Sequence, residues 1–304
     1  MNSQATDTSK FWKDGYLIIK SVFTPEEIEF FRSEISKRDD SAAGDQSKGD
    51  ILSNSNPELS KVIYDDRILT IAKEILGGVP VYFGDSTISV GSHHRGWHKD
   101  NRLPDRFQHH LADWSSQYSL IRFGVYLQDH KRHSGGLAVR KGSHNRSRLV
   151  NRVNKLEIPF MDEIKGRRVV TRMAIWASNL YGRAKILDVE VGDLVVWNQR
   201  TTHSGNALRA KLLPWLKMPT WLENKIPEGL IKKYHKDRMA FFMTYGLDDA
   251  HLSRAIDFLK KRKYMVNSWA VSTISDTTLG KIDSDALQVK QPPEIADDWV
   301  PPHP

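Results

Sequence analysis

The sequence contains no cysteine, and this absence excludes several kinds of chemistry. Disulfides, thiolate metal ligands and a cysteine nucleophile are ruled out, and the absence is compatible with a reducing compartment. No run of about 18 apolar residues occurs, and the N-terminal stretch 1–15 lacks the apolar segment of a signal peptide. We therefore expect a cytoplasmic protein with no transmembrane segment.

Glycine-rich phosphate loops and the nucleophile elbow of serine hydrolases are also missing from the sequence. What the chain has instead is an excess of basic residues, with a net charge of +8 and a pI of about 9.4. Such a charge favours anionic partners: nucleic acid, a membrane surface or an acidic small molecule. It is equally compatible with a solvated basic face. Because no nucleic-acid-binding motif is present, we expect no nucleic-acid partner.

A single domain spanning residues 1–304 is expected, since no repeat or linker interrupts the chain. Its N-terminal region, 1–78, is predicted to be helical. Thr24 and Glu27 form a capping box that predicts a helix over 24–38. A second helix is predicted within 65–78, and the polar stretch 39–56 between them is expected to be a mobile loop.

Strand-like segments follow, and they predict the core of the domain. They are short, rich in β-branched and aromatic residues, and lie within 79–92, 118–130, 135–144, 189–199 and 238–246. Within the second of them, Ile121, Phe123 and Val125 alternate with Arg122 and Gly124, the pattern of a strand with two different faces. The fold class predicted is therefore mainly β with flanking helices, as an antiparallel sandwich or barrel over about 79–246.

Two parts of the chain fall outside this pattern. Residues 150–188 have no clear order, and residues 207–237 resemble an insertion that carries Trp215 and Trp221. Those tryptophans would line a lid over a substrate, contact a membrane surface peripherally, or pack on the barrel. Residues 247–304 are predicted to form an amphipathic helix over 251–265 and an extended, proline-rich tail.

A His-x-Asp pair, His98 and Asp100, is the leading candidate for a metal site. Two residues apart on a strand, both side chains face the same way and can bind one ion. A histidine from elsewhere would complete the 2-His-1-carboxylate triad that holds Fe(II) and leaves coordination positions open. His203 follows an apolar strand about a hundred residues later and is assigned that role. A second pair, at His235, has too little chain after it to wrap a barrel.

The order of these segments resembles the phytanoyl-CoA dioxygenase family of Fe(II)/2-oxoglutarate-dependent oxygenases. FWKDGYLIIKSVFTPEEIEFFR is similar to the family's N-terminal region, and GWHKDN is similar to its His-x-Asp segment. RFGVYLQDHKRHSGGLAVRKGSHN resembles the family's strand, turn and Gly-Gly-Leu sequence. VGDLVVWNQRTTHSGN resembles the segment with the distal histidine, and RMAFFMTYG the closing strand.

The resemblance implies a double-stranded β-helix, the cupin-like jelly roll. It also implies a metal-binding, catalytic triad of His98, Asp100 and His203, and 2-oxoglutarate and O₂ as co-substrates. An arginine is expected to bind the distal carboxylate of 2-oxoglutarate. Arg238 opens the closing strand and is preferred, with Arg209 as the alternative.

The activity implied is hydroxylation of a small or lipid-like, anionic metabolite, with 2-oxoglutarate converted to succinate and CO₂. Halogenating relatives lack the carboxylate ligand, so Asp100 favours hydroxylation. The alternative is a non-catalytic jelly-roll protein that binds a ligand. Arg95, Arg102 and Arg106 flank the site and would either grip an anionic substrate or lie in a solvated loop. Seven further histidines are interpreted as surface or loop residues: His93, His94, His109, His110, His130, His133 and His144.

Overall fold

A computed structural model gives the fold of the chain, with two sheets and several helices. It describes residues 6–37, 49–53, 56–91, 98–100, 118–130, 134–145, 184–207, 209–213, 227–232, 238–260 and 262–293. The strands are β1 (Tyr16–Ile19), β2 (Val81–Val90), β3 (Ile121–Tyr126), β4 (Gly136–Arg140), β5 (Ala184–Ile186), β6 (Leu194–Asn198), β7 (His203–Ala207), β8 (Met239–Gly246) and β9 (Gln288–Val289). The helices are α1 (Thr8–Asp14), α2 (Pro25–Ser36), α3 (Pro57–Ser60), η1 (Lys61–Tyr64), α4 (Asp66–Leu76), η4 (Glu228–Leu230), α7 (Ala250–Leu259), α8 (Lys263–Ala270) and α9 (Asp276–Leu279).

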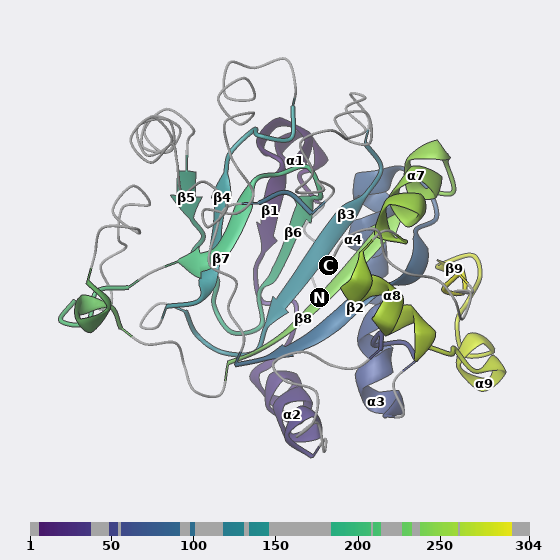
Figure 1. Cartoon of the computed structure of the whole chain (residues 1–304), viewed down its shortest axis with the longest axis horizontal. Helices are drawn as coiled ribbons and strands as arrows, with labels where there is room; N and C mark the ends of the chain where they lie inside the picture. The colour runs from purple at the N-terminus through teal and green to yellow at the C-terminus, as the bar shows by residue number, and fades with distance from the viewer. Residues whose placement is uncertain are drawn as a thin grey trace.

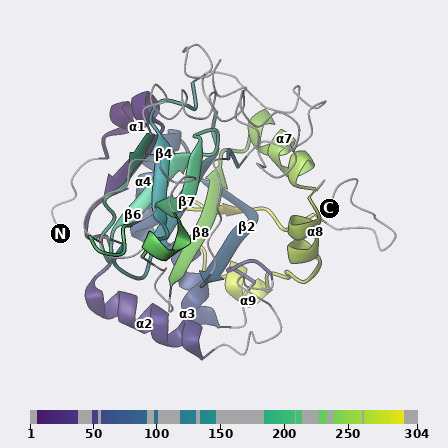
Figure 2. The same ribbon diagram turned by 60° about the vertical axis from the view of Figure 1, so that its left-hand side comes forward.

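The larger sheet has six strands in the order β1-β6-β3-β8-β2-β9, and the smaller sheet has the order β5-β4-β7. Neighbouring strands are antiparallel except for the short β9, which runs parallel to β2. In Figure 1 the smaller sheet lies to the left of the larger sheet, and α7, α8 and α9 lie to its right. The turned view in Figure 2 places α2 and α3 together at one end of the molecule.

The two faces of the larger sheet pack against different partners. On the outer face, Phe123 and Phe241 join a core cluster with the helices, and the rings of Phe31 and Phe241 lie 5.3 Å apart. On the inner face, Tyr126 and Trp197 pack with buried residues of β4 in the smaller sheet. The alternation predicted for β3 is therefore confirmed, and its inner face carries Arg122, Gly124 and Tyr126.

Helix α2 begins where the sequence predicts. The Thr24 hydroxyl accepts a hydrogen bond from the backbone N–H of Glu27, and the Glu27 carboxylate accepts one from the N–H of Thr24. Such caps contribute about 1 kcal/mol to stability. The second predicted helix is α4, which ends at Gly77 in the left-handed conformation.

Several elements differ from the sequence-based expectation. Strand β1 lies within the N-terminal region expected to be helical and pairs with β6 at the edge of the larger sheet. Within the stretch expected to be a mobile loop, Ile51 and Leu52 are buried in the main core. The single helix predicted over 251–265 is broken into α7 and α8.

The predictions for the insertion and for the stretch without clear order fall largely on residues outside the described segments. Trp215 and Trp221 of the predicted insertion lie outside the described residues, as does all of 150–183. In the described part of the chain, none of the helices has the length and apolar character needed to cross a membrane.

Candidate metal centre

Two segments that are far apart in the sequence bring the proposed ligands together. His98 and His203 form an antiparallel backbone bridge, in which each N–H donates to the other's carbonyl at 2.9 Å. His203 is the first residue of β7, in the smaller sheet. The backbone N–H of Asp100 donates to the carbonyl of Gln199, just after β6 in the larger sheet, at 3.2 Å. The site is thus fixed by backbone hydrogen bonds to both sheets.

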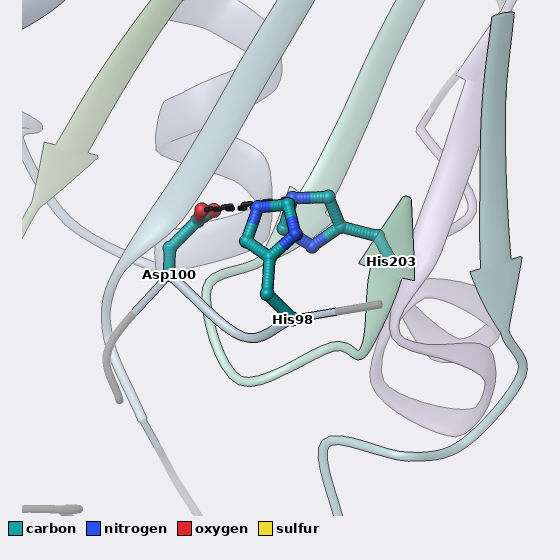
Figure 3. A group of neighbouring side chains, drawn as sticks. All are labelled: His98, Asp100 and His203. Atoms are coloured by element: carbon teal, nitrogen blue, oxygen red, sulfur yellow. Dashed lines mark ion pairs between the residues drawn. The ribbon is translucent and has the colours of Figure 1, made fainter. Parts of the chain in front are cut away.

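The three side chains converge, as Figure 3 shows. One ligand atom from each of His98, Asp100 and His203 lies within 4.8 Å of the others, and no other such group is found in the described part of the chain. Asp100 Oδ1 lies 3.7 Å from Nε2 of His98 and 3.5 Å from Nε2 of His203. These distances are too long for ideal hydrogen bonds. They suit three donors arranged around one ion.

Neighbouring groups orient two of these ligands. Nδ1 of His203 lies 3.0 Å from the carbonyl oxygen of Thr201, which fixes the proton on Nδ1 and leaves Nε2 facing the site as a lone-pair donor. Trp197 Nε1 donates to Oδ2 of Asp100 at 3.2 Å, so the other oxygen of that carboxylate points toward the histidines. A metal would therefore meet preoriented donors.

The charge on Asp100 is strongly favoured. Burial alone would raise its pKa, but attraction to a protonated His203, to Arg122 and to a protonated His98, together with the hydrogen bond from Trp197, outweighs burial and lowers the pKa to about 2. Asp100 is therefore a carboxylate at any pH at which the protein would be assayed. A neutralising cation fits this position.

The donor set itself indicates which metals fit. Two imidazole nitrogens and one carboxylate oxygen are the ligands of non-haem Fe(II) sites with open positions, and the set lacks the thiolates typical of structural zinc. The residues present thus suit Fe(II), and His98, Asp100 and His203 would hold it.

Lys99 lies between two of the proposed ligands but faces the opposite way. Its side chain is buried, and its ammonium donates to the carbonyls of Ser143 at 2.8 Å and Arg200 at 2.6 Å. One carbonyl follows β4 and the other precedes β7, which carries His203. Lys99 therefore ties the His-x-Asp segment to both strands of the smaller sheet that lie nearest to it.

Both candidate arginines for 2-oxoglutarate are buried near the segment 134–135. Arg238 Nη1 donates to the Ser89 hydroxyl at 3.2 Å, and its Nε donates to the carbonyl of Gly135 at 3.3 Å. Arg209 Nε donates to the carbonyl of His130 at 3.1 Å, and its backbone N–H donates to the Ser134 hydroxyl. The two guanidinium groups thus have different surroundings.

Two of the seven histidines interpreted as surface or loop residues lie in the described part of the chain, in the loops that follow β3 and β4, and neither is at the surface. His130 and His144 are buried. His130 Nε2 pairs with the Gln128 amide, and His144 Nε2 lies 2.8 Å from the carbonyl of Trp12. The other five of these histidines, and Arg95, Arg102 and Arg106, lie outside the described residues.

Sequence reasoning missed the residues that support the ligands. Lys99 and Trp197 carry no motif of their own, and folding alone brings Trp197 to Asp100 and Lys99 to the carbonyls of Ser143 and Arg200. Arg122 did give a signal, because a lone arginine within the apolar segment SLIRFGVYL must face something polar.

Comparison with known proteins gives one family and several relatives. The model of the family "Phytanoyl-CoA dioxygenase (PhyH)" matches residues 11–211. An ectoine dioxygenase of Stutzerimonas stutzeri (strain A1501) is 29% identical over 152 residues, which cover 44% of this chain and 48% of that protein. An ectoine dioxygenase of Streptomyces coelicolor is 25% identical over 157 residues, which cover 46% and 50%. The chain therefore spans about half the length of each of these relatives.

Solved structures agree with the fold. Apo HygX from Streptomyces hygroscopicus has a TM-score of 0.52 at 17% identity, covering 80% of this chain and 87% of that one. EctD from S. alaskensis with bound Fe has a TM-score of 0.51 at 14% identity, covering 81% and 78%. At such low identity the likeness concerns the fold alone, and it confirms the predicted cupin-like jelly roll. Since the family model matches well over half of the sequence, the chain belongs to the phytanoyl-CoA dioxygenase family.

Proposed function

We propose that the chain is an Fe(II)- and 2-oxoglutarate-dependent dioxygenase that hydroxylates a small, anionic metabolite. The observation that carries this proposal is the convergence of His98, Asp100 and His203 within 4.8 Å of one another. Membership of the family and the ectoine dioxygenase relatives support it. When bound, the iron would activate O₂ with 2-oxoglutarate as the reductant, yielding succinate, CO₂ and a hydroxylated product.

The three ligand residues would each act in a defined way. Both histidines bind as neutral imidazoles, and the Thr201 carbonyl holds His203 in the tautomer that presents Nε2. Asp100 would bind through Oδ1, because Trp197 engages Oδ2. Three ligands leave the other coordination positions for the keto acid and O₂.

Arg238 is the residue we propose for the distal carboxylate of 2-oxoglutarate. It directly precedes Met239 of β8, whose side chain is on the outer face, so strand alternation puts Arg238 on the inner face with Ala240. Tyr126 is a buried inner-face residue, and burial raises the pKa of its hydroxyl to about 12. The positive charge of Arg238 acts on this hydroxyl in the opposite direction. Arg209 instead follows β7 and reaches the carbonyl of His130.

Two neutral donors would assist Arg238. The Ser89 hydroxyl lies 3.2 Å from Arg238 Nη1. The Tyr126 hydroxyl stays protonated, and it has no hydrogen-bond partner among the residues that the structure describes. A carboxylate bound beside Arg238 would accept hydrogen bonds from both, which is the usual arrangement for a buried anion.

The test needs no substrate. Fe(II) and 2-oxoglutarate are added to the metal-free protein without oxygen, and the weak visible charge-transfer band of a keto acid chelated to iron is recorded. We expect the band in the wild type, its loss in His98→Ala, and a 2-oxoglutarate requirement raised at least tenfold in Arg238→Ala.

Arg209→Ala serves as the matched control, because it removes a buried guanidinium from the same end of the barrel. If Arg209→Ala raises the requirement and Arg238→Ala does not, the two arginines exchange roles. If the folded wild type gives no band, the proposed function is wrong and the non-catalytic binding protein becomes the better description.

A further inference from the structure

Arg122 is a charged residue on the inner face of the larger sheet that the proposed mechanism does not yet use. It lies on β3, where the register places it opposite Trp197 of β6 and Thr244 of β8. Its neighbours at 121 and 123 face the helices. Strand alternation therefore turns the guanidinium toward the interior between the two sheets.

A buried acid holds one end of this guanidinium. Nη1 of Arg122 donates to both carboxylate oxygens of Asp85, at 3.2 and 3.1 Å, and to the Thr244 hydroxyl at 3.3 Å. Asp85 also accepts from Thr244 at 2.7 Å and from the Gln199 amide at 3.4 Å. Asp85 thus has a full set of donors and little capacity for a further ligand.

The other edge of the guanidinium is available. Within the described part of the chain, Nε and Nη2 of Arg122 have no hydrogen-bond partner, since all of its bonds are made through Nη1. The Arg122 side chain is 17% exposed, whereas that of Asp85 is 5% exposed. The Nε–Nη2 edge is the side of an arginine that grips a carboxylate with two parallel hydrogen bonds.

This edge lies beside the candidate metal centre. Trp197, the neighbour of Arg122 across the strands, donates directly to Asp100. Burial lowers the pKa of Arg122, but the charges of Asp85 and Asp100 outweigh burial and raise it overall, so the guanidinium keeps its charge there.

Arg122 and Arg238 stand at opposite ends of the inner face. Thr244 marks the position of Arg122 on β8, and Arg238 comes six residues before Thr244. At about 3.3 Å per residue, the two backbones are separated by about 20 Å. Each end of the inner face thus has its own arginine.

We propose that Arg122 binds a carboxylate of the organic substrate through its Nε–Nη2 edge, with Asp85 and Thr244 as positioning residues. This inference rests on the proposed function, and it narrows the substrate to a carboxylic acid. Only one side chain, that of Trp197, lies between Arg122 and the proposed ligand Asp100. The carbon that is oxidised would therefore lie only a few bonds from the carboxylate of the substrate.

The test measures binding rather than turnover. The protein is loaded with Mn(II) and saturating 2-oxoglutarate, and short carboxylates (propionate, butyrate and benzoate) are titrated by calorimetry beside their methyl esters. We expect the acids to bind and the esters to bind at least tenfold more weakly. In Arg122→Gln the preference for the acids disappears, whereas Arg209→Gln retains it.

Arg122→Gln leaves Asp85 buried without a counter-charge. If this variant is unstable for that reason, two further variants still test the proposal. The double variant Arg122→Gln/Asp85→Asn removes both charges and is expected to lose acid binding while retaining metal binding. Arg122→Lys keeps the charge without the fork, and we expect several-fold weaker acid binding.

Each contrary outcome has one meaning. If the wild type binds Mn(II) and 2-oxoglutarate but none of the acids, or if the double variant binds them unchanged, the role of Arg122 is refuted. If the double variant instead needs tenfold more 2-oxoglutarate, Arg122 serves the co-substrate and this inference is again wrong. If the wild type binds neither metal nor 2-oxoglutarate, the proposed function itself fails.

Discussion

Lys99 carries a charged side chain in a buried position. A buried ammonium is costly unless it is hydrogen-bonded, and this one is satisfied by two backbone carbonyls. Those bonds fix the rotation of the segment so that His98 and Asp100 face the centre. Lys99 thus positions the ligands without touching the metal.

Replacement of this lysine is expected to weaken metal binding. Lys99→Met retains the apolar stem but leaves the carbonyls of Ser143 and Arg200 without their donor. Partners that orient metal ligands typically change metal affinity by about 10–100-fold, and we expect a loss in that range for Mn(II). The measurement is a titration of metal-free protein with Mn(II), followed by the electron paramagnetic resonance signal of the free ion.

Lys141→Met is the matched control for Lys99→Met. Lys141 pairs with Asp14 at 2.8 Å, and its side chain is 37% exposed. Its loss is expected to leave metal affinity unchanged. Equal affinities in both variants would mean that Lys99 stabilises the fold without positioning the ligands.

At the scale of elements, the turn between α1 and β1 supports the segment that leads to His203. Gly15 adopts a left-handed conformation, with φ of 84°. Its carbonyl accepts hydrogen bonds from the Thr201 hydroxyl at 2.7 Å and from the Asn198 N–H at 3.0 Å. A Cβ atom at Gly15 would lie 2.4 Å from His144 Nδ1 and 2.6 Å from Thr201 Oγ1.

A methyl group at this turn is therefore expected to disturb both stability and the site. Gly77→Ala is the matched control, because Gly77 is also left-handed but its Cβ would meet nothing within 4 Å. Gly77→Ala should cost about 1–2 kcal/mol from backbone strain alone. Gly15→Ala should cost about 1–3 kcal/mol more, from overpacking, and should weaken Mn(II) binding. Urea unfolding and Mn(II) titration of both variants check this, and equal costs would contradict it.

The N-terminus of α2 gives a pH-dependent prediction. Hydrogen bonds from Arg67 lower the pKa of Glu27 more than its partial burial raises it. Because the pKa of Glu27 is lower in the folded state, the ion pair stabilises the protein fully at pH values above the ordinary pKa of glutamate. This stabilisation is lost as the pH falls through the lowered folded-state pKa.

Glu27→Gln is expected to reduce stability modestly at pH 7, because it keeps the capping geometry but removes the charge. The side chains are 29% and 37% exposed, so solvent screening limits the effect to about 0.5 kcal/mol. The difference from wild type should shrink as the pH falls from 5 to 3, as followed by urea unfolding. Thr24→Ala, which removes the cap itself, should cost about 1 kcal/mol throughout. A Glu27→Gln effect that stays constant with pH would contradict the charge argument.

At the scale of the whole molecule, the candidate metal centre joins the two sheets. Asp100 is bonded to the end of β6, and His203 opens β7. A metal bound there should stabilise the folded state by about 2.7 kcal/mol at a concentration 100-fold above its Kd. We expect Mn(II) to raise the Tm by a few degrees in a thermal scan, and His98→Ala to abolish the shift.

The control for this shift is His251→Ala, which removes a histidine on α7 outside the cluster. It should retain the full effect of Mn(II). A shift that persists in His98→Ala would place the bound metal elsewhere on the chain.

Local sequence signals predicted the elements well where one residue pattern decides the outcome. The capping box at Thr24, the left-handed Gly77 and the alternation along β3 all correspond to observed elements. The sequence also proposed the three candidate ligands, because a His-x-Asp pair and a distal histidine after an apolar strand fit the chemistry of such a site, and the structure brings these side chains together.

The rest could not be predicted, because distant parts of the chain decide it. Strand β1 consists of only four residues, and it is a strand because β6 provides an edge for it. Ile51 and Leu52 lie in a polar stretch, and their burial depends on where the core accommodates them. Lys99 and Arg122 acquire their roles from partners 37 to 122 residues away.

The backbone bridge between His98 and His203 also has a consequence for how the protein folds. The bridge closes a loop of about a hundred residues. Such long-range contacts form late in folding, because the chain loses conformational entropy on closing the loop before the contacts stabilise it. A chain that has not yet docked its two sheets has no centre at which to capture a metal. Mn(II) should therefore slow the unfolding measured by stopped flow while leaving the refolding rate almost unchanged. In a refolding solution, the time course of Mn(II) binding would therefore report when the two sheets dock, which is the last step of folding.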